Sequence, residues 1–183
     1  MEKKVGIIVG SLRKESYNKK VAKLLTEIAP KELSFEFIDI ANIPLYNQDF
    51  DDLDQIPPEY ITFRKSIENL DAVLFVTPEY NRSMPAVLKN AIDVASRPYG
   101  HNKWDKKPAG IVSVSVGNIS GFGANHHLRQ TLTFINMPTM QQPEAYFGHV
   151  SDVLEENGEC KDPKTIAFLT NFMQAFAAWI KLF

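Results

Sequence analysis

The sequence predicts an α/β fold, a doubly wound parallel sheet between layers of helices, and three observations predict it. Three runs, 5–9, 71–77 and 109–116, are almost continuously apolar, as in strands that are buried on both faces of a parallel sheet. After each run, apolar residues recur at helical spacing on one stripe. A polar turn joins each run to its helix. The chain therefore alternates strands and helices along its length.

The first part of the chain supplies two strands and two helices. The strand 5–9 is followed by a helix whose apolar stripe covers 21–28. Residues 33–40 alternate apolar and polar side chains for their first half, which is typical of a half-exposed strand near a sheet edge. The segment 42–58, rich in Asp and Pro, is too polar for a core and is predicted to be a long surface loop. A helix follows, starting near Pro58.

The middle of the chain supplies the second buried strand. This strand, 71–77, ends in the polar turn 78–83. Ser83 is the expected N-cap of the next helix, with Pro85 in its first turn. A loop over 97–107 separates that helix from the following strand.

The last part of the chain supplies the third buried strand and an edge strand. The strand 109–116 ends in a Gly-rich turn over 117–123, and a helix follows. The weaker strand 139–147 contains Pro143, which has no N–H to donate to a neighbouring strand. We therefore expect this strand at a sheet edge. An amphipathic helix over 166–180 is expected to cover the sheet.

Three strands buried on both faces and two edge strands, the second and the fifth, suit a sheet of order 2-1-3-4-5 with right-handed crossovers. In such a sheet a ligand lies outside the carboxyl ends of the strands, around the switch point between the first and third strands. The turns 10–18, 78–83 and 115–123 all fall at those ends. We therefore expect one domain, 1–183, in which three polar turns converge on one site.

The first of these turns suits a phosphate. It places hydroxyls, an amide and one arginine before a helix N-terminus, where free N–H groups and the helix dipole attract anions. The residues are Ser11, Arg13, Ser16, Tyr17 and Asn18. The alternative is that Ser16 or Asn18 only caps the helix and that Arg13 is a solvated charge. The segment has neither a P-loop signature nor a G-x-G-x-x-G motif, which argues against a dinucleotide held in the Rossmann manner.

The other two turns suit a flat ring. The second offers Tyr80 and a run of backbone amides beside a proline-bounded bend, and the third offers glycines that let the backbone approach a ligand closely. A phosphate at one end and a planar heteroaromatic at the other describe a mononucleotide such as FMN. The alternative for Tyr80 alone is a half-buried packing residue.

Composition argues against several classes of partner. The net charge is −2, so there is no electrostatic case for nucleic acid or a membrane surface. No apolar run reaches the roughly 18 residues that a membrane span needs, and the first residues do not look like a signal peptide. The single Cys160 has no Cys or His at metal-ligand spacing and suits a reducing cytoplasm. We expect no metal site.

Two segments, GSLRKESYN and TPEYNRSMPAVLKNAIDVAS, resemble the NAD(P)H-dependent FMN reductase and quinone reductase family, the flavodoxin-like group that includes chromate- and azo-reducing enzymes. The resemblance runs from the first strand through the final helix and implies a flavodoxin-like three-layer fold. It implies that the first turn holds the FMN phosphate and that the other two turns line the isoalloxazine. The residues implied are Ser11, Arg13, Ser16, Tyr17 and Asn18 for the phosphate, and Pro78, Glu79, Tyr80, Asn81, Ser115 and Gly117 for the ring. The third turn departs from the family's compact Gly-Gly step, because it is longer and carries Phe122.

The resemblance also implies the reaction. Hydride passes from NADPH or NADH to FMN, and two electrons then pass to a small-molecule acceptor, which is a quinone, an azo or nitro compound, a flavin or a metal oxyanion. No acid–base dyad is required, so no catalytic residue is named. Two alternatives stay open, an electron carrier of flavodoxin type and a flavin-binding sensor without turnover. The net charge of −2 argues against the carrier, a class that tends to be strongly acidic.

A homodimer or homotetramer is the expected working unit. The resemblance implies a dimer, and the loop 97–107 displays Pro98, Tyr99 and Trp104, aromatic and proline side chains that suit an interface. The alternative is that Trp104 packs onto its own subunit. Two further clusters are interpreted as solvated rather than functional, namely the pair His126–His127 and the acidic group Asp49, Asp51, Asp52 and Asp54.

Overall fold

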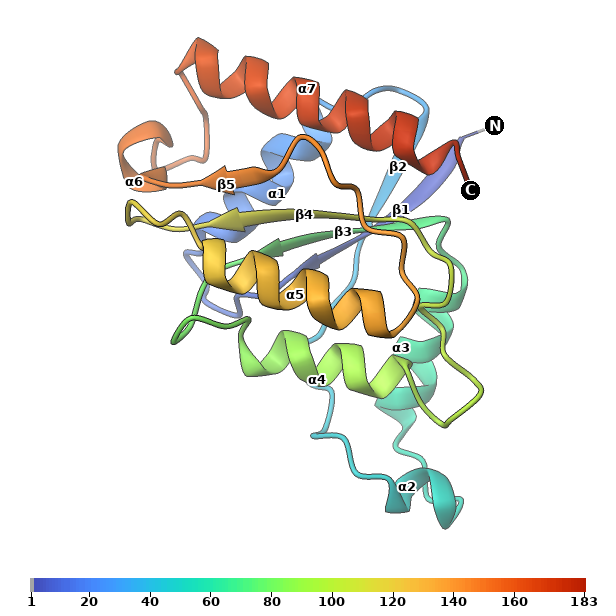
Figure 1. Ribbon diagram of the computed structural model, residues 1–183. Helices are drawn as coiled ribbons and strands as arrows, with labels where there is room; N and C mark the ends of the chain where they lie inside the picture. Colours follow the sequence, from blue (N-terminus) through green and yellow to red (C-terminus); the bar gives the residue numbers. More distant parts are fainter. Residues whose placement is uncertain (1) are drawn as a thin grey trace.

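The computed structural model describes residues 2–183 and contains one sheet with helices on both faces (Figure 1). Residue 1 of the expected domain lies outside the described part. The strands are β1 (Lys3–Val9), β2 (Leu33–Phe37), β3 (Ala72–Thr77), β4 (Ala109–Val114) and β5 (Ala145–Phe147). The helices are α1 (Tyr17–Glu27), α2 (Asp49–Asp52), α3 (Pro58–Glu68), α4 (Ala86–Ala95), α5 (Phe122–Phe134), α6 (Val150–Val153) and α7 (Pro163–Ile180). Among the described residues, no helix combines the length and the apolar character needed to cross a membrane.

All neighbouring strands pair in parallel, in the order β2-β1-β3-β4-β5. The predicted order 2-1-3-4-5 is therefore confirmed, as is the placement of the second and fifth strands at the edges. Along the centre of the sheet, Val5 lies opposite Ala72 and Val73 lies opposite Ala109. The chain leaves β1 toward one edge and β3 toward the other, so the switch point lies between these two strands.

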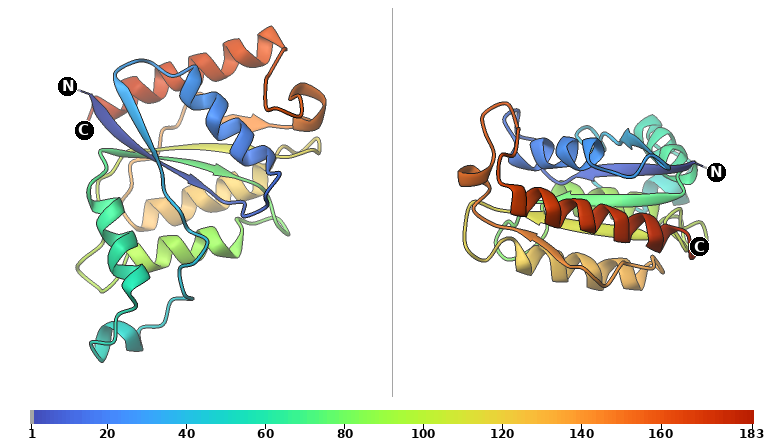
Figure 2. Two further views of the ribbon diagram at one scale, coloured as in Figure 1. Left: turned by 180° about the vertical axis from the view of Figure 1, so that it is seen from behind. Right: turned by 90° about the horizontal axis from the view of Figure 1, so that it is seen from above.

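Two helical layers cover the sheet, as Figure 2 shows from behind and from above. On one face Ile7 and Leu74 pack with α1 and α7, and on the other Ile8 and Phe75 pack with α3, α4 and α5. All four side chains are fully buried. Successive side chains of a strand point to opposite faces, which explains this alternation. The central strands are apolar throughout because both of their faces meet a helical layer.

Four strands are shorter than predicted, and β3 is so only because it begins at Ala72 instead of Asp71. β2 ends at Phe37 instead of Ile40, and β4 ends at Val114. Within the predicted strand 139–147, only the last residues form β5. Pro143 has no N–H to donate, which explains why the ladder does not run through the whole segment.

The connection 42–58 between β2 and α3 is less exposed than predicted. It contains the short helix α2, and Tyr46 and Phe50 pack against the core on the α3–α5 face. Asn90 of α4 fixes its start, because Nδ2 donates to Pro44 O at 2.9 Å and Oδ1 accepts from Tyr46 N at 2.8 Å. The prediction that this segment is too polar for the core is therefore wrong for its aromatic residues.

A buried ion pair holds the same connection against α3. The Arg64 guanidinium makes two parallel bonds to the Asp51 carboxylate, at 2.7 and 2.8 Å, and Arg64 Nε donates to Val94 O at 2.9 Å. The Arg64 and Asp51 side chains are 10% and 3% exposed. The interpretation of Asp51 as a solvated charge is therefore wrong, because a partner on α3 neutralises it. The other acidic residues of the cluster, Asp49, Asp52 and Asp54, are exposed.

Trp104 is buried in its own subunit. It has no exposed area, its Nε1 donates to a backbone carbonyl of α4 at 2.9 Å, and its ring lies 6.1 Å from those of Phe63 and Phe75 between centroids. The prediction that the loop 97–107 displays Trp104 is wrong, and the alternative of packing onto its own subunit is confirmed. Tyr99 of the same loop is 92% exposed.

The two ends of the described chain meet at the amino edge of the sheet. Lys3 N donates to Glu32 O at 2.8 Å, and Lys181 Nζ donates to the Glu32 carboxylate at 3.0 Å. The hydrogen bond from Lys181 lowers the pKa of Glu32. Figure 1 shows both ends beside the starts of β1 and β2, away from the tips of the strand arrows.

We expect Arg64→Ala to lower the free energy of unfolding by about 3–5 kcal/mol, because Asp51 would remain as an unpaired buried carboxylate. The matched control is Lys89→Ala, which removes an ion pair of similar length, 2.7 Å to Asp93, whose side chains are 46% and 39% exposed. That loss should stay below about 1 kcal/mol. Urea unfolding followed by circular dichroism measures both. Equal losses in the two variants would contradict a special role for the buried pair.

Candidate active site

Three turns meet where the strands end, at the switch point of the sheet (Figure 1). They follow β1, β3 and β4 and lead into α1, α4 and α5. Gly10 N donates to Val76 O at 2.9 Å, and a Cβ on Gly10 would lie 3.0 Å from Thr77 Oγ1 and 3.3 Å from Pro78 Cδ. A side chain at this position would press on both neighbours, so glycine lets the first two turns approach closely.

The first turn holds a helix cap and one buried amide oxygen that has no partner in the described part of the chain. Ser16 caps α1, because its Oγ accepts from Lys19 N at 3.4 Å. Capping uses only the acceptor of this hydroxyl and leaves its proton for a ligand. Asn18 is 6% exposed, and its Oδ1 has no hydrogen-bond partner among the described residues. A buried acceptor without a donor costs about 1–3 kcal/mol, which a bound hydroxyl or N–H group would recover.

The remaining residues of this turn differ in exposure. Ser11 is buried, at 4% exposure, whereas Arg13 is exposed. Tyr17 is half-buried, and Lys20 Nζ lies 5.4 Å from the centroid of its ring. An exposed guanidinium beside a helix N-terminus can turn toward an anion placed there and bind two of its oxygens.

The second turn is a tight hairpin of the backbone. Tyr80 N donates to Ser83 O at 2.9 Å, and Ser83 N donates to Tyr80 O at 3.0 Å. Between them Asn81 and Arg82 have left-handed φ values of 51° and 67°, as a type I′ turn requires. Tyr80 is 49% exposed, so its ring is not committed to the core. The turn therefore presents an aromatic ring and a polar tip at the end of β3.

Ser83 does not cap α4. The N-cap position is Pro85, and the Ser83 hydroxyl instead hydrogen-bonds to His127 Nδ1 on α5 at 2.7 Å. The prediction of a Ser83 N-cap is wrong, because this residue still belongs to the hairpin. The neighbouring His126 bonds through Nε2 to Tyr146 Oη at 2.8 Å, so the two exposed histidines are not simply solvated. Within residues 2–183, no group of three or more His, Cys, Asp or Glu residues is placed to hold a metal ion.

Glu79 directs its carboxylate toward α5. Oε2 accepts from Ala124 N at 3.1 Å, and Oε1 accepts from Arg82 at 3.0 Å. The Glu79 side chain is only 13% exposed. Because both carboxylate oxygens accept hydrogen bonds within the protein, Glu79 would contact a ligand through its backbone rather than through its side chain.

The third turn leaves open space beside its backbone. Ser115 Oγ accepts from Gly117 N at 3.1 Å. A Cβ on Gly117 would meet nothing closer than Ser115 Oγ at 3.7 Å, and the φ of Gly117 is not left-handed. The fold itself does not require glycine at this position. The missing side chain therefore leaves room for a flat ligand against the backbone.

The third turn ends in an aromatic cluster. The Phe122 ring lies 4.2 Å from that of His126 and 5.5 Å from that of Tyr146, between centroids. Burial raises the pKa of Tyr146, and the neighbouring Glu144 carboxylate raises it further, to about 12. Tyr146 therefore stays a neutral phenol. The sequence signals only Phe122, because the contact with Tyr146 joins α5 to β5 across the fold.

These features fit FMN. The N-terminus of α1, with the Ser11 and Ser16 hydroxyls, suits a phosphate, and the unpaired Asn18 oxygen suits a hydroxyl of the ribityl chain. The open backbone at Gly117 and the half-exposed Tyr80 ring suit a planar heterocycle. The residues that suit an anion and those that suit a flat ring thus lie at the same, carboxyl end of the strands.

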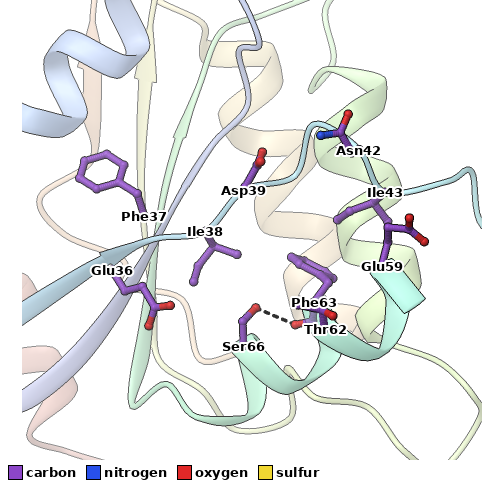
Figure 3. A pocket seen from close by; sticks show the side chains of 10 residues that line it. All are labelled: Glu36, Phe37, Ile38, Asp39, Asn42, Ile43, Glu59, Thr62, Phe63 and Ser66. Carbon is purple, nitrogen blue, oxygen red and sulfur yellow. Dashed lines mark hydrogen bonds between the residues drawn. The ribbon is translucent and has the colours of Figure 1, made fainter. Parts of the chain in front are cut away.

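A separate hollow of about 260 Å³ lies beside β2 and α3 (Figure 3). Three carboxylates, from Glu36, Asp39 and Glu59, contribute to its walls. On the same wall, Ser66 Oγ donates to Phe63 O at 2.7 Å. None of the residues expected to hold FMN lines this hollow. Its carboxylates would repel a phosphate, so it is not the anion site.

Comparison with known proteins identifies the family of the chain. The family described as NADPH-dependent FMN reductase matches residues 3–152. A quinone reductase of Pseudomonas putida is 55% identical over 179 residues, which covers 97% of this chain and 95% of the relative. A 2-hydroxy-1,4-benzoquinone reductase of Burkholderia sp. is 43% identical over 181 residues, which covers 99% of this chain and 98% of the relative.

Two solved structures are similar to this chain. FerB, a flavoenzyme NAD(P)H:(acceptor) oxidoreductase from Paracoccus denitrificans, matches with a TM-score of 0.92 at 40% identity, over 98% of each chain. A flavodoxin from the domain Archaea matches with a TM-score of 0.62 at 11% identity, over 97% of this chain and 99% of its own, and shares the fold alone. The predicted flavodoxin-like fold and the family resemblance are both confirmed. The chain therefore belongs to the NADPH-dependent FMN reductase family.

Proposed function

We propose that this enzyme binds FMN non-covalently at the three turns, oxidises NADPH or NADH, and reduces a quinone. One juxtaposition carries the proposal: the buried, unpaired amide oxygen of Asn18 and the open backbone at Gly117 lie on the same edge of the sheet. The names of the two sequence relatives, quinone reductase and 2-hydroxy-1,4-benzoquinone reductase, support a quinone as the acceptor.

The proposed site residues divide by the part of FMN that they hold. The planar guanidinium of Arg13 matches two phosphate oxygens, and the Ser11 and Ser16 hydroxyls add donors beside the free amides of α1. Asn18 Oδ1 accepts from a ribityl hydroxyl. The residues proposed to bind the phosphate end of FMN are Ser11, Arg13, Ser16, Tyr17 and Asn18. Those proposed to line the ring are Pro78, Glu79, Tyr80, Asn81, Ser115 and Gly117.

The protein's part in the reaction is to position the partners. FMN held by these residues would supply the chemistry of hydride acceptance and two-electron transfer. The Tyr80 and Phe122 rings, each 49% exposed, are surfaces against which a nicotinamide or a quinone can stack. The N–H groups of Tyr80, Ser83 and Gly117 already donate within the protein, and backbone N–H groups of the second and third turns that are not used in this way would donate toward a ring edge, where charge develops during reduction. No acid–base dyad is needed for these steps, and we assign no catalytic side chain.

Quinones rank ahead of the other acceptors because the two relatives bear quinone reductase names. Azo and nitro compounds, flavins and metal oxyanions follow from the family resemblance. The single cysteine of the chain, Cys160, is a buried free thiol, which supports a reducing compartment, and we propose the cytoplasm.

We further propose a homodimer, or a homotetramer built from two dimers, as the working unit. With Trp104 buried, the support rests on Tyr99, which is 92% exposed, and on Leu45 and Leu53 beside α2, which are 78% and 63% exposed. Large apolar side chains with this exposure suit an interface between copies of the chain.

Arg13→Ala should weaken FMN binding by about 1.5–3 kcal/mol, because a charge-assisted hydrogen bond to the phosphate is lost. Riboflavin, which has no phosphate, should bind the wild-type protein and the variant with the same low affinity. Quenching of flavin fluorescence during titration of the apoprotein measures all four affinities. Equal affinity of the wild-type protein for FMN and riboflavin would refute the phosphate site.

Mixing the FMN-loaded protein with NADPH, and separately with NADH, in a stopped-flow instrument should rapidly bleach the flavin absorbance. A quinone added afterwards should restore the colour, and steady-state kinetics should be ping-pong. A flavodoxin-type carrier would react only slowly with either nicotinamide, and a sensor would bind FMN without turnover. Bleaching that a quinone does not reverse would reject the proposed acceptor.

Light scattering during size-exclusion chromatography should give at least twice the chain mass of 20.7 kDa. Tyr99→Ser should shift the population toward the monomer, because it removes an apolar side chain from the proposed interface. Phe168→Ser on α7 is the control, since it removes a 41% exposed aromatic from the other face of the sheet. A 20.7 kDa particle with full activity at nanomolar concentration would contradict the dimer.

A further inference from the structure

The turn after β3 is fastened to α5 at two points. Near its start, Glu79 Oε2 accepts from Ala124 N at 3.1 Å. At its end, the Ser83 hydroxyl hydrogen-bonds to His127 Nδ1 at 2.7 Å. Residues three apart on a helix lie on the same side of it, so both contacts reach the same side of α5.

Helix α5 needs a cap that its own residues do not supply. Its N-cap position is Gly121, which has no side chain, and the first helical turn of α5 contains no acidic residue. The first amides of a helix have no partner within the helix, and the positive end of the helix dipole lies among them. The Glu79 carboxylate supplies both an acceptor and a negative charge at the amide of Ala124. A residue of the second turn therefore caps the helix that follows the third turn.

The packing at this contact requires a glycine on α5. A Cβ on Gly123 would lie 2.9 Å from Glu79 Oε2 and 3.0 Å from Arg82 O. The second turn also keeps Asn81 and Arg82 in left-handed conformations, which cost energy in residues other than glycine. Contact with α5 at both ends of the turn offsets this cost and holds the turn in one conformation.

We propose that Glu79 is a positioning residue, whose carboxylate caps α5 from the neighbouring turn and so locks the turns 78–83 and 115–121 into one unit. The capping itself depends only on contacts within the protein. Its effect on FMN rests on the proposed function, in which both turns border the ring. Loss of the cap leaves only the Ser83–His127 contact between the second turn and α5, so the start of the turn, at Glu79, is no longer held against the helix.

Three variants test this role. Glu79→Ala removes the cap, Glu79→Gln keeps an acceptor oxygen for Ala124 N without the charge, and Arg82→Ala removes only the 69% exposed partner of Glu79 Oε1. Hydrogen–deuterium exchange of the apoprotein, measured over 122–126, reports the cap in the absence of flavin. We expect exchange to be about fivefold faster in Glu79→Ala, the effect of a lost helix cap. Exchange should be largely restored in Glu79→Gln and unchanged in Arg82→Ala.

FMN titration of the same proteins tests the positioning. We expect Glu79→Ala to bind FMN with roughly three- to tenfold lower affinity, a change that corresponds to the free energy of one lost helix cap. The absorption spectrum of the bound flavin should also change. Glu79→Gln should mostly recover both the affinity and the spectrum. Unchanged exchange in Glu79→Ala would overturn the cap. Faster exchange with unaltered affinity and spectrum would overturn the positioning role. Failure of the wild-type protein to bind FMN would overturn the proposed function and the positioning together, whereas the exchange result would still decide the cap.

Discussion

The candidate site depends on the close contact between Gly10 and the end of β3. The backbone of the first turn hydrogen-bonds to Val76 there and has little room for a side chain against Thr77. Because the chain leaves β1 and β3 toward opposite edges of the sheet, their turns diverge above this contact. The contact therefore fixes the starts of the first two turns relative to each other, and with them the polar residues that those turns carry.

Helices α1 and α5 are capped in different ways, and this difference decides which of the two caps the sequence predicts. Ser16, a residue of the preceding turn, caps α1, so the local string of hydroxyls and arginine already indicates an anion site. Glu79, a residue of another turn, caps α5. The hairpin at Asn81 and Arg82 lacks the glycine that usually signals a type I′ turn. The directions of Glu79 and His127 follow from tertiary packing, and no local pattern predicts them.

The same distinction runs through the fold. The central strands are predictable because burial on both faces leaves a continuous apolar run, and Pro143 correctly indicates an edge. Asp51 and Trp104 are not predictable in this way. Asp51 stands in a polar loop and is buried only because Arg64 neutralises it, and Trp104 lies among polar residues but is covered by aromatic rings from α3 and β3. In both cases a partner distant in the sequence decides the burial.

The anchoring of both ends of the described chain on Glu32 has a consequence for the connectivity of the fold. In a parallel sheet all strands have their amino ends on one side and their carboxyl ends on the opposite side. Glu32 lies at the amino ends and the three turns lie at the carboxyl ends. A short linker could join residues 2 and 183 without passing the site, and new ends could be opened in an exposed connection outside the three turns. Such a circular permutant would keep every contact among the three turns, because the order of strands in space, rather than the order along the chain, assembles them.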